Sequence, residues 1–175
     1  MSSLFSFDPA FTPDAVRAWH GRPARSHTGA THGYQGRTTH AGTDHHRGVP
    51  IQRHHLLRCH CGAVVLRLHL PDGVVSPRRC DCSMCRRRGA IVASVKLADL
   101  EIVQGHDELR LYQFNTRVAR HHFCSVCGIY THHQRRSSPD EYGYNVGCLD
   151  GVNPFDIGQV PVNDGVNHPA DANRV

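Results

Sequence analysis

The chain has 175 residues, a formal net charge of +5 and 39% hydrophobic residues. This length fits one domain plus a tail and is too long to need disulfide staples for stability. No stretch approaches the 18 consecutive apolar residues of a membrane span, so the sequence does not predict a helical membrane protein.

Residues 1–50 are predicted to form a low-complexity tail. Between residues 21 and 50 the composition is mostly Gly, Thr, His, Arg, Ser and Ala, with Tyr34 and Val49 as the sizeable apolar side chains. Such a composition cannot bury enough apolar surface to offset the entropy of ordering. We therefore expect a flexible tail. A histidine metal reservoir and a targeting segment are alternative interpretations.

From Arg58 onward the pattern predicts an all-β domain. Residues 64–70 alternate between apolar and polar side chains, which is typical of a half-buried strand. One helical turn is expected at residues 97–100. Turn residues separate the other candidate strands, which are residues 91–95, 100–103, 109–114, 118–123, 129–133 and 142–149. These short strands predict a domain of small sheets over residues 51–157, followed by an irregular tail over residues 158–175.

Seven of the eight cysteines fall in three tight groups. Cysteines one or three residues apart can bring their sulfurs within about 4 Å, the edge of a zinc–sulfur tetrahedron. A disulfide framework is the less favoured alternative, since Cys80 and Cys82 are too close for a comfortable bridge. The groups read Cys59-His60-Cys61, Cys80-Asp81-Cys82-Ser83-Met84-Cys85 and Cys124-Ser125-Val126-Cys127.

The first and third groups predict one closed, structural zinc site. Four sulfurs complete a tetrahedron, and the site would join chain segments more than sixty residues apart. Each pair is followed by a glycine, which can adopt the positive φ that a tight turn requires. We expect Cys59, Cys61, Cys124 and Cys127 to be the ligands.

The second group offers three sulfurs and predicts a site with one open position. Flanking arginines, among them Arg86, Arg87 and Arg88, could lower the thiol pKa values and bind the carboxylates of a small anionic substrate. A fourth ligand from His60, His121 or His122 would close the site and make it structural; this alternative stays open.

Four motifs resemble the glutathione-dependent formaldehyde-activating family, which includes the centromere protein V relatives. They appear in the expected order over residues 57–157 and read Cys-His-Cys-Gly, Cys-Asp-Cys-Ser-Met-Cys-Arg-Arg-Arg-Gly, His-His-Phe-Cys-Ser-Val-Cys-Gly and Asn-Val-Gly-Cys-Leu-Asp. The resemblance implies an Mss4-like fold of small sheets. It also implies two Zn²⁺: a structural ion on Cys59, Cys61, Cys124 and Cys127, and a catalytic ion on Cys80, Cys82 and Cys85.

The activity implied is a carbon–sulfur lyase reaction written in reverse, which joins formaldehyde to the co-substrate glutathione. A related thiol adduct is a second possible substrate, because family membership does not transfer substrate identity. The candidate donors to the developing alkoxide are His121, His122 and Tyr130. The remaining cysteine, Cys148, is expected to be a buried small hydrophobe.

A non-catalytic zinc-binding interaction module, related to chromosome- and microtubule-associated family members, is the competing hypothesis. Binding two Zn²⁺ through seven thiolates would lower the net charge to about +2, which disfavours a nucleic-acid partner. The expected partners are a small thiol and an aldehyde, without a membrane, in the cytoplasm. The oligomeric state is left open, with a homodimer as one alternative.

Overall fold

The computed structural model describes residues 45–46, 49–168 and 171. All of them belong to one compact unit, His40–Val175. Most of the predicted N-terminal tail therefore lies outside the described residues, and the prediction of a flexible tail stays a prediction. In the described part of the chain, no helix is long and apolar enough to cross a membrane.

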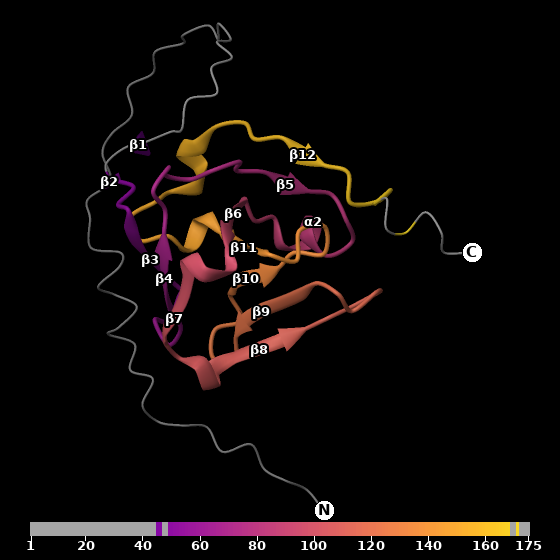
Figure 1. Ribbon diagram of the computed structural model, residues 1–175, viewed down its shortest axis with the longest axis horizontal. Coiled ribbons are helices and arrows are strands. Elements are labelled where there is room, and N and C mark those ends of the chain that lie inside the picture. Colours follow the sequence, from indigo (N-terminus) through magenta and orange to yellow (C-terminus); the bar gives the residue numbers. More distant parts are fainter. Residues whose placement is uncertain (1–44, 47–48, 169–170, 172–175) are drawn as a thin grey trace, which may run out of the picture. The chain divides into compact units, whose positions relative to one another are not determined.

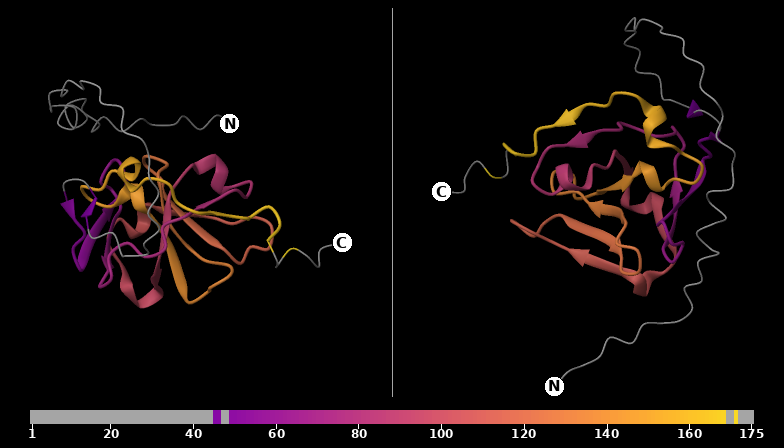
Figure 2. Two further views of the ribbon diagram at one scale, coloured as in Figure 1. Left: turned by 90° about the horizontal axis from the view of Figure 1, so that it is seen from above. Right: turned by 180° about the vertical axis from the view of Figure 1, so that it is seen from behind.

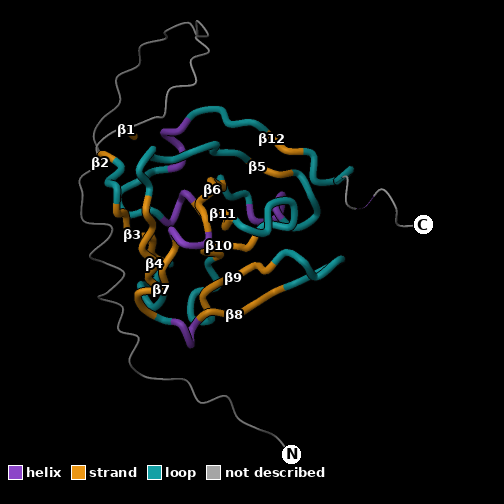
Figure 3. The backbone as a smooth tube through the Cα atoms, viewed as in Figure 1, coloured by secondary structure: helices purple, strands orange, loops and turns teal. Residues whose placement is uncertain are grey.

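Short strands dominate the described chain, with little helix between them (Figures 1 and 3). The strands are β1 His45–His46, β2 Val49–Pro50, β3 His54–Arg58, β4 Val65–His69, β5 Arg79–Cys80, β6 Val92–Lys96, β7 Leu100–Gln104, β8 Leu109–Tyr112, β9 Arg120–Cys124, β10 Tyr130–Gln134, β11 Glu141–Asn145 and β12 Val162–Asn163. The helical pieces are α2 Cys85–Arg88 and the 3₁₀ turns η1 Leu97–Asp99, η2 His106–Glu108, η3 Val146–Cys148 and η4 Pro154–Ile157. The all-β class and the expected turn near residues 97–100 are confirmed.

Two antiparallel sheets carry the fold (Figure 2). The larger has five strands in the order β6-β11-β10-β9-β8, and the smaller has three in the order β3-β4-β7. In the larger sheet, β9 and β10 pair so that His121 lies opposite His133 and His122 lies opposite His132. A third, two-stranded parallel sheet joins β5 to β12.

The core is built from the inward faces of both sheets. In β4, Leu66 and Leu68 are fully buried while Arg67 is exposed, as the alternating pattern predicts. They pack in one cluster with Tyr144 of β11 and Val146 of η3. Burying a leucine side chain stabilises the fold by roughly 1.5–3 kcal/mol.

The structure differs from the sequence prediction at several elements, among them the helical pieces α2, η2, η3 and η4, which were not predicted. Strand β3, which was not among the predicted strands, begins at His54 and buries His55, whose Nε2 lies 2.9 Å from the carbonyl of Asp150. The strand expected over residues 142–149 ends at Asn145, because the Asn145 side chain accepts a hydrogen bond from the N–H of Gly147 and starts η3. Strand β12 adds order to the tail that was expected to be irregular.

Candidate metal centres and the adjoining cavity

The first and third cysteine groups meet at the junction of the two sheets. Cys59 and Cys61 follow β3, and Cys124 ends β9. The Sγ atom of Cys61 lies 3.6 Å from that of Cys59 and 3.7 Å from that of Cys124. All four sulfurs, including that of Cys127, fall within 4.8 Å of one another. These separations match the edge of a tetrahedron with Zn–S near 2.3 Å.

Two tight turns present these sulfurs. The N–H of Gly62 donates to the carbonyl of Cys59 at 3.0 Å, and the N–H of Gly128 donates to that of Cys124 at 2.9 Å. Gly62 and Gly128 have φ of 77° and 73°, which a side chain would disfavour. The predicted role of both glycines is confirmed.

The thiol pKa values in this group diverge. Burial raises the pKa of Cys61 to about 12, and its sulfur neighbours add to the effect. Burial opposes ionisation of Cys127 too, but backbone N–H groups lower its pKa to about 7. A thiolate at one cysteine raises the pKa of the neighbouring thiols. A divalent cation bound among the sulfurs would offset the negative charge of several thiolates at once.

The second group forms a separate cluster that runs from the end of β5 to the start of α2. Its three sulfurs, from Cys80, Cys82 and Cys85, also lie within 4.8 Å of one another. The N–H of Cys85 points at the Cys82 sulfur, 3.4 Å away. Among the described residues, no histidine nitrogen or carboxylate oxygen joins all three sulfurs within that distance. The donor set therefore offers a metal ion three ligands and leaves room for a fourth.

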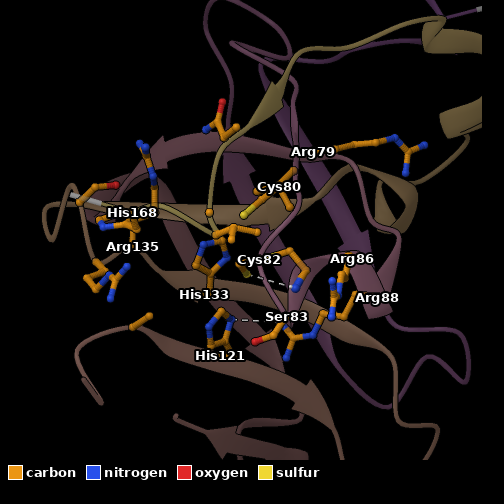
Figure 4. A pocket seen from close by; sticks show the side chains of 18 of the residues that line it. Arg79, Cys80, Cys82, Ser83, Arg86, Arg88, His121, His133, Arg135 and His168 are labelled. Carbon is orange, nitrogen blue, oxygen red and sulfur yellow. Dashed lines mark hydrogen bonds between the residues drawn. The ribbon is translucent and has the colours of Figure 1, made fainter. Parts of the chain in front are cut away.

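This three-cysteine cluster forms part of the wall of a cavity of about 860 Å³ (Figure 4). The side chains around it come from β5, α2, β9 and β10 and from the chain beyond β12. A cavity of this volume can hold a molecule the size of a short peptide.

The cavity is lined by many cations. Six arginines contribute to its wall, namely Arg78, Arg79, Arg86, Arg88, Arg135 and Arg136. Two of these have carboxylate partners: Arg135 pairs with Glu141, and Arg136 pairs with Asp171. Burial lowers the pKa of Arg78 and Arg88 from its ordinary value, but a guanidinium keeps its proton. The remaining arginines are suited to anionic groups such as carboxylates.

Stacked rings form another part of the wall. The His121 ring stacks on Phe114 with centroids 5.8 Å apart and on His133 with centroids 5.0 Å apart. The guanidinium of Arg88 lies 4.1 Å from the ring centroid of Tyr130, a cation–π contact. The hydroxyl of Tyr130 lies 2.5 Å from His133 Nδ1 and 3.3 Å from the Gly143 carbonyl, so it is already engaged.

His121 has a defined tautomer. Arg88 Nη1 can only donate, and it lies 3.0 Å from His121 Nδ1, so that nitrogen accepts. Burial, followed by the charge of Arg88, lowers the pKa of His121 to about 4. The ring is therefore neutral near pH 7 and carries its proton on Nε2, for which the described residues show no hydrogen-bond partner.

The other residues singled out in the sequence lie elsewhere. Arg87 is exposed, donates to the carbonyl of Ser83 at 2.6 Å and is not among the residues that line the cavity. His122 points to the opposite face of the sheet and stacks on His132 with centroids 4.6 Å apart. Cys148 is buried, with its sulfur 3.6 Å from the carbonyl of Tyr130. His60 is exposed.

Sequence reasoning missed His133, Arg135 and Arg136 as cavity residues. A signal was available: in neighbouring antiparallel strands, a histidine of β9 and one of β10 can share a face. Using it required the register between the strands, which the sequence does not show.

The fold and these two clusters define a class: all-β proteins of small sheets, with one four-cysteine cluster and one three-cysteine cluster beside a cavity. The family model described as glutathione-dependent formaldehyde-activating enzyme matches residues 54–158. The chain belongs to this family, as the motifs suggested, and its fold is mostly β-sheet with little helix, as expected.

The chain is also similar to a solved structure. A crystal structure of a Rhodobacter sphaeroides protein, a structural genomics target, is 59% identical over 62% of this chain and 99% of its own length, with a TM-score of 0.60. Membership in the family, together with the cysteine clusters, indicates zinc binding and glutathione use.

Proposed function

We propose that this protein is a zinc-dependent carbon–sulfur lyase-type enzyme that interconverts glutathione plus formaldehyde with S-hydroxymethylglutathione, or acts on a related thiol adduct. The observation that carries the proposal is the three-cysteine cluster in the wall of an arginine-rich cavity. A purely structural site would be expected to close with a fourth protein ligand, as the Cys59, Cys61, Cys124 and Cys127 cluster does.

Two Zn²⁺ would be held, one by each cluster. The sulfurs fit this ion because they are soft donors at tetrahedral spacing. When bound by Cys80, Cys82 and Cys85, zinc would make a thiol that enters the cavity lose its proton near neutral pH.

The arginines are assigned to binding and orientation. Glutathione carries two carboxylates, and Arg86 and Arg88 flank the cluster from α2. A guanidinium can bind a carboxylate through two parallel hydrogen bonds, which fixes orientation as well as position. Orientation of the thiol toward the aldehyde carbon then accounts for part of the rate enhancement.

His121 is assigned the role of hydrogen-bond donor to the oxygen of the aldehyde. In the forward direction the sulfur of the substrate forms a bond to the aldehyde carbon, and the electron pair of the C=O π bond moves to oxygen. The proton released by the thiol ends on that oxygen, so the overall step is an addition that needs no oxidant. The Nε2–H of His121 would stabilise the oxygen as its negative charge develops.

The compartment and partners follow from the same chemistry. All eight cysteines are free thiols in the structure. Thiolate ligands persist in a reducing compartment, so we place the protein in the cytoplasm, with a small thiol and an aldehyde as its partners.

The proposal is tested by loading the protein with zinc and following S-hydroxymethylglutathione formation by NMR exchange between free and adduct formaldehyde. The expected result is exchange faster than the spontaneous reaction, and exchange at the spontaneous rate would contradict the proposal. Arg86→Ala should raise the KM for glutathione about tenfold, since one charge-assisted hydrogen bond is worth about 1.5–3 kcal/mol. The matched control is Arg87→Ala, which changes the neighbouring charge outside the cavity and should have a smaller effect.

The competing hypothesis is a non-catalytic zinc-binding interaction module. It predicts no acceleration, together with salt-sensitive binding of nucleic acid or tubulin that survives Cys82→Ser.

A further inference from the structure

Residues 161–168, which we call the C-terminal strap, run beside the three-cysteine loop. Strand β12 of the strap pairs in parallel with β5, so that Asn163 lies opposite Cys80 (Figure 1). The N–H of Arg79 donates to the carbonyl of Pro161 at 2.9 Å, and the N–H of Asp81 donates to that of Asn163 at 3.3 Å. The strap thus bonds to the backbone on both sides of Cys80.

Gly165 brings the strap against two of the cluster's cysteines. A Cβ atom at this position would lie 2.5 Å from Cys80 Sγ and 2.7 Å from Cys82 Cβ. Either distance is far inside van der Waals contact. Any side chain at residue 165 would therefore displace the strap or the cysteines.

Asp81 ties the two segments together. It stands between Cys80 and Cys82, and its Oδ1 accepts hydrogen bonds from the N–H of Gly165 at 2.6 Å and of Val166 at 3.3 Å. A carboxylate that accepts two backbone N–H groups is held more firmly than one that faces solvent. This pair of bonds therefore fixes the turn that presents the two sulfurs.

The strap is itself braced. Asp164 accepts from the backbone N–H of Asn167 at 2.8 Å and from its side-chain amide at 3.0 Å, which closes a turn around Gly165. Farther along the chain, Asp171 makes two bonds to Arg136, at 2.9 and 3.0 Å. Strap residues, Gly165 among them, also line the cavity.

Burial of apolar surface does not explain this arrangement. Val162 and Val166 are each 62% exposed, so the strap contributes little to the hydrophobic core. It makes hydrogen bonds to Arg79 and Asp81, and it lies beyond residue 158, where the match to the family ends.

We propose that Asp81 and Gly165 are positioning residues for the second metal site: through them the C-terminal strap clamps Cys80 and Cys82 in the geometry that a metal ion requires. Neither residue supplies a ligand. Groups that orient metal ligands are typically worth 10- to 100-fold in metal affinity. This inference rests on the proposed function, because that function assigns a metal ion to the three-cysteine cluster.

Cobalt(II) alone, without glutathione, is the probe, because its visible absorption reports the geometry of thiolate ligands. The unmodified chain should take up two equivalents, the first at the four-cysteine site. Asp81→Ala should weaken the second equivalent by 10- to 100-fold and alter its absorption band, and leave the first unchanged. Asp81→Asn keeps an acceptor oxygen and should restore the affinity.

Gly165→Val should reproduce the effect of Asp81→Ala by steric displacement. The matched control is Gly147→Ala, whose Cβ would meet its nearest atoms at 3.4 Å, an ordinary contact. Because the contacts between Asp81 and the strap add little to the core, Asp81→Ala and Gly165→Val should both remain folded, as circular dichroism would show.

The outcomes separate this inference from the proposed function. Two equivalents with unchanged affinity in both Asp81→Ala and Gly165→Val would overturn the strap inference and leave the function standing. Weakened second-site affinity in a chain that does not accelerate the glutathione reaction would support the strap and contradict the function. Uptake of one equivalent by the unmodified chain would overturn both.

Discussion

At the scale of single residues, His121 shows how a hydrogen bond can define a chemical role. Arg88 donates a hydrogen bond to Nδ1 of His121, so the N–H proton of the neutral ring is on Nε2. Two of the three donors that the sequence suggested are less suited: the Tyr130 hydroxyl is engaged with His133, and His122 faces away from the cavity. These distinctions depend on strand register and side-chain geometry, which is why the sequence left all three open.

Replacement of His121 tests this role directly. His121→Phe keeps a ring between Phe114 and His133 but removes the N–H donor, so kcat should fall by about 10²–10³ with a smaller change in KM. His122→Phe is the matched control, because it changes the adjacent ring on the other face of the same strand. Equal losses in the two variants, measured as initial rates with glutathione and formaldehyde, would contradict the assignment.

At the scale of elements, the four-cysteine cluster joins the two sheets. It links the turn after β3, in the three-stranded sheet, to the turn between β9 and β10, in the five-stranded sheet. Bound zinc would therefore fasten together elements that otherwise meet mainly through the core. Structural zinc contributes about 10–16 kcal/mol in small zinc domains, which is comparable to the total stability of a typical domain.

Cys124→Ser should consequently unfold the domain, whereas Cys82→Ser should leave a folded protein that retains one zinc. Circular dichroism and metal analysis on the two purified variants would check this. Cys124→Ser protein that is folded and still holds two zinc ions would show that the structural assignment is wrong.

The elements that the sequence predicted well are those with a clear apolar alternation. Strand β4 is one example, because Leu66 and Leu68 repeat at a spacing of two. Strand β3 was missed because His55, a polar residue, occupies a buried position and is satisfied by the Asp150 carbonyl. The short helix α2 was missed as well: its four residues carry no apolar period, and Gly89 ends it with a φ of 65°.

At the scale of the whole molecule, buried imidazoles connect the fold to acid sensitivity. Burial, followed by the charge of His122, lowers the pKa of His132 from 6.5 to about 3. When the pH falls below about 6.5, the unfolded chain binds a proton that the folded chain does not bind. The free energy of unfolding then decreases by about 1.4 kcal/mol for each pH unit until the pH approaches the folded-state value.

His132→Phe should therefore reduce the loss of stability between pH 7.5 and pH 5.5 by about 1 kcal/mol, whatever its effect at neutral pH. Urea unfolding of both proteins at the two pH values provides the measurement. Protonation of the cysteine ligands contributes equally to both chains and cancels in the difference. His106→Gln, at an exposed position, serves as the control, and an identical pH dependence in His132→Phe would refute the prediction.

The sequence predicted the candidate metal site better than it predicted the cavity. Spacing within each cysteine group is local, and two pairs of sulfurs complete a tetrahedron, so the clusters of four and three could be inferred from the chain alone. The cavity is lined by Arg78, which precedes β5, by Arg88 of α2 and by Arg135, which follows β10. Residues of the strap line it as well. Those segments are brought together by tertiary structure, and no local pattern marks their proximity.

The central claim is that the three-cysteine cluster holds a zinc ion with a position open to a substrate thiol. The most direct measurement is zinc stoichiometry on the purified protein, combined with zinc X-ray absorption before and after saturation with glutathione. We predict two zinc ions, with a gain in the average number of sulfur ligands when glutathione is added. A single zinc ion, or two whose sulfur coordination does not respond to glutathione, would contradict this account.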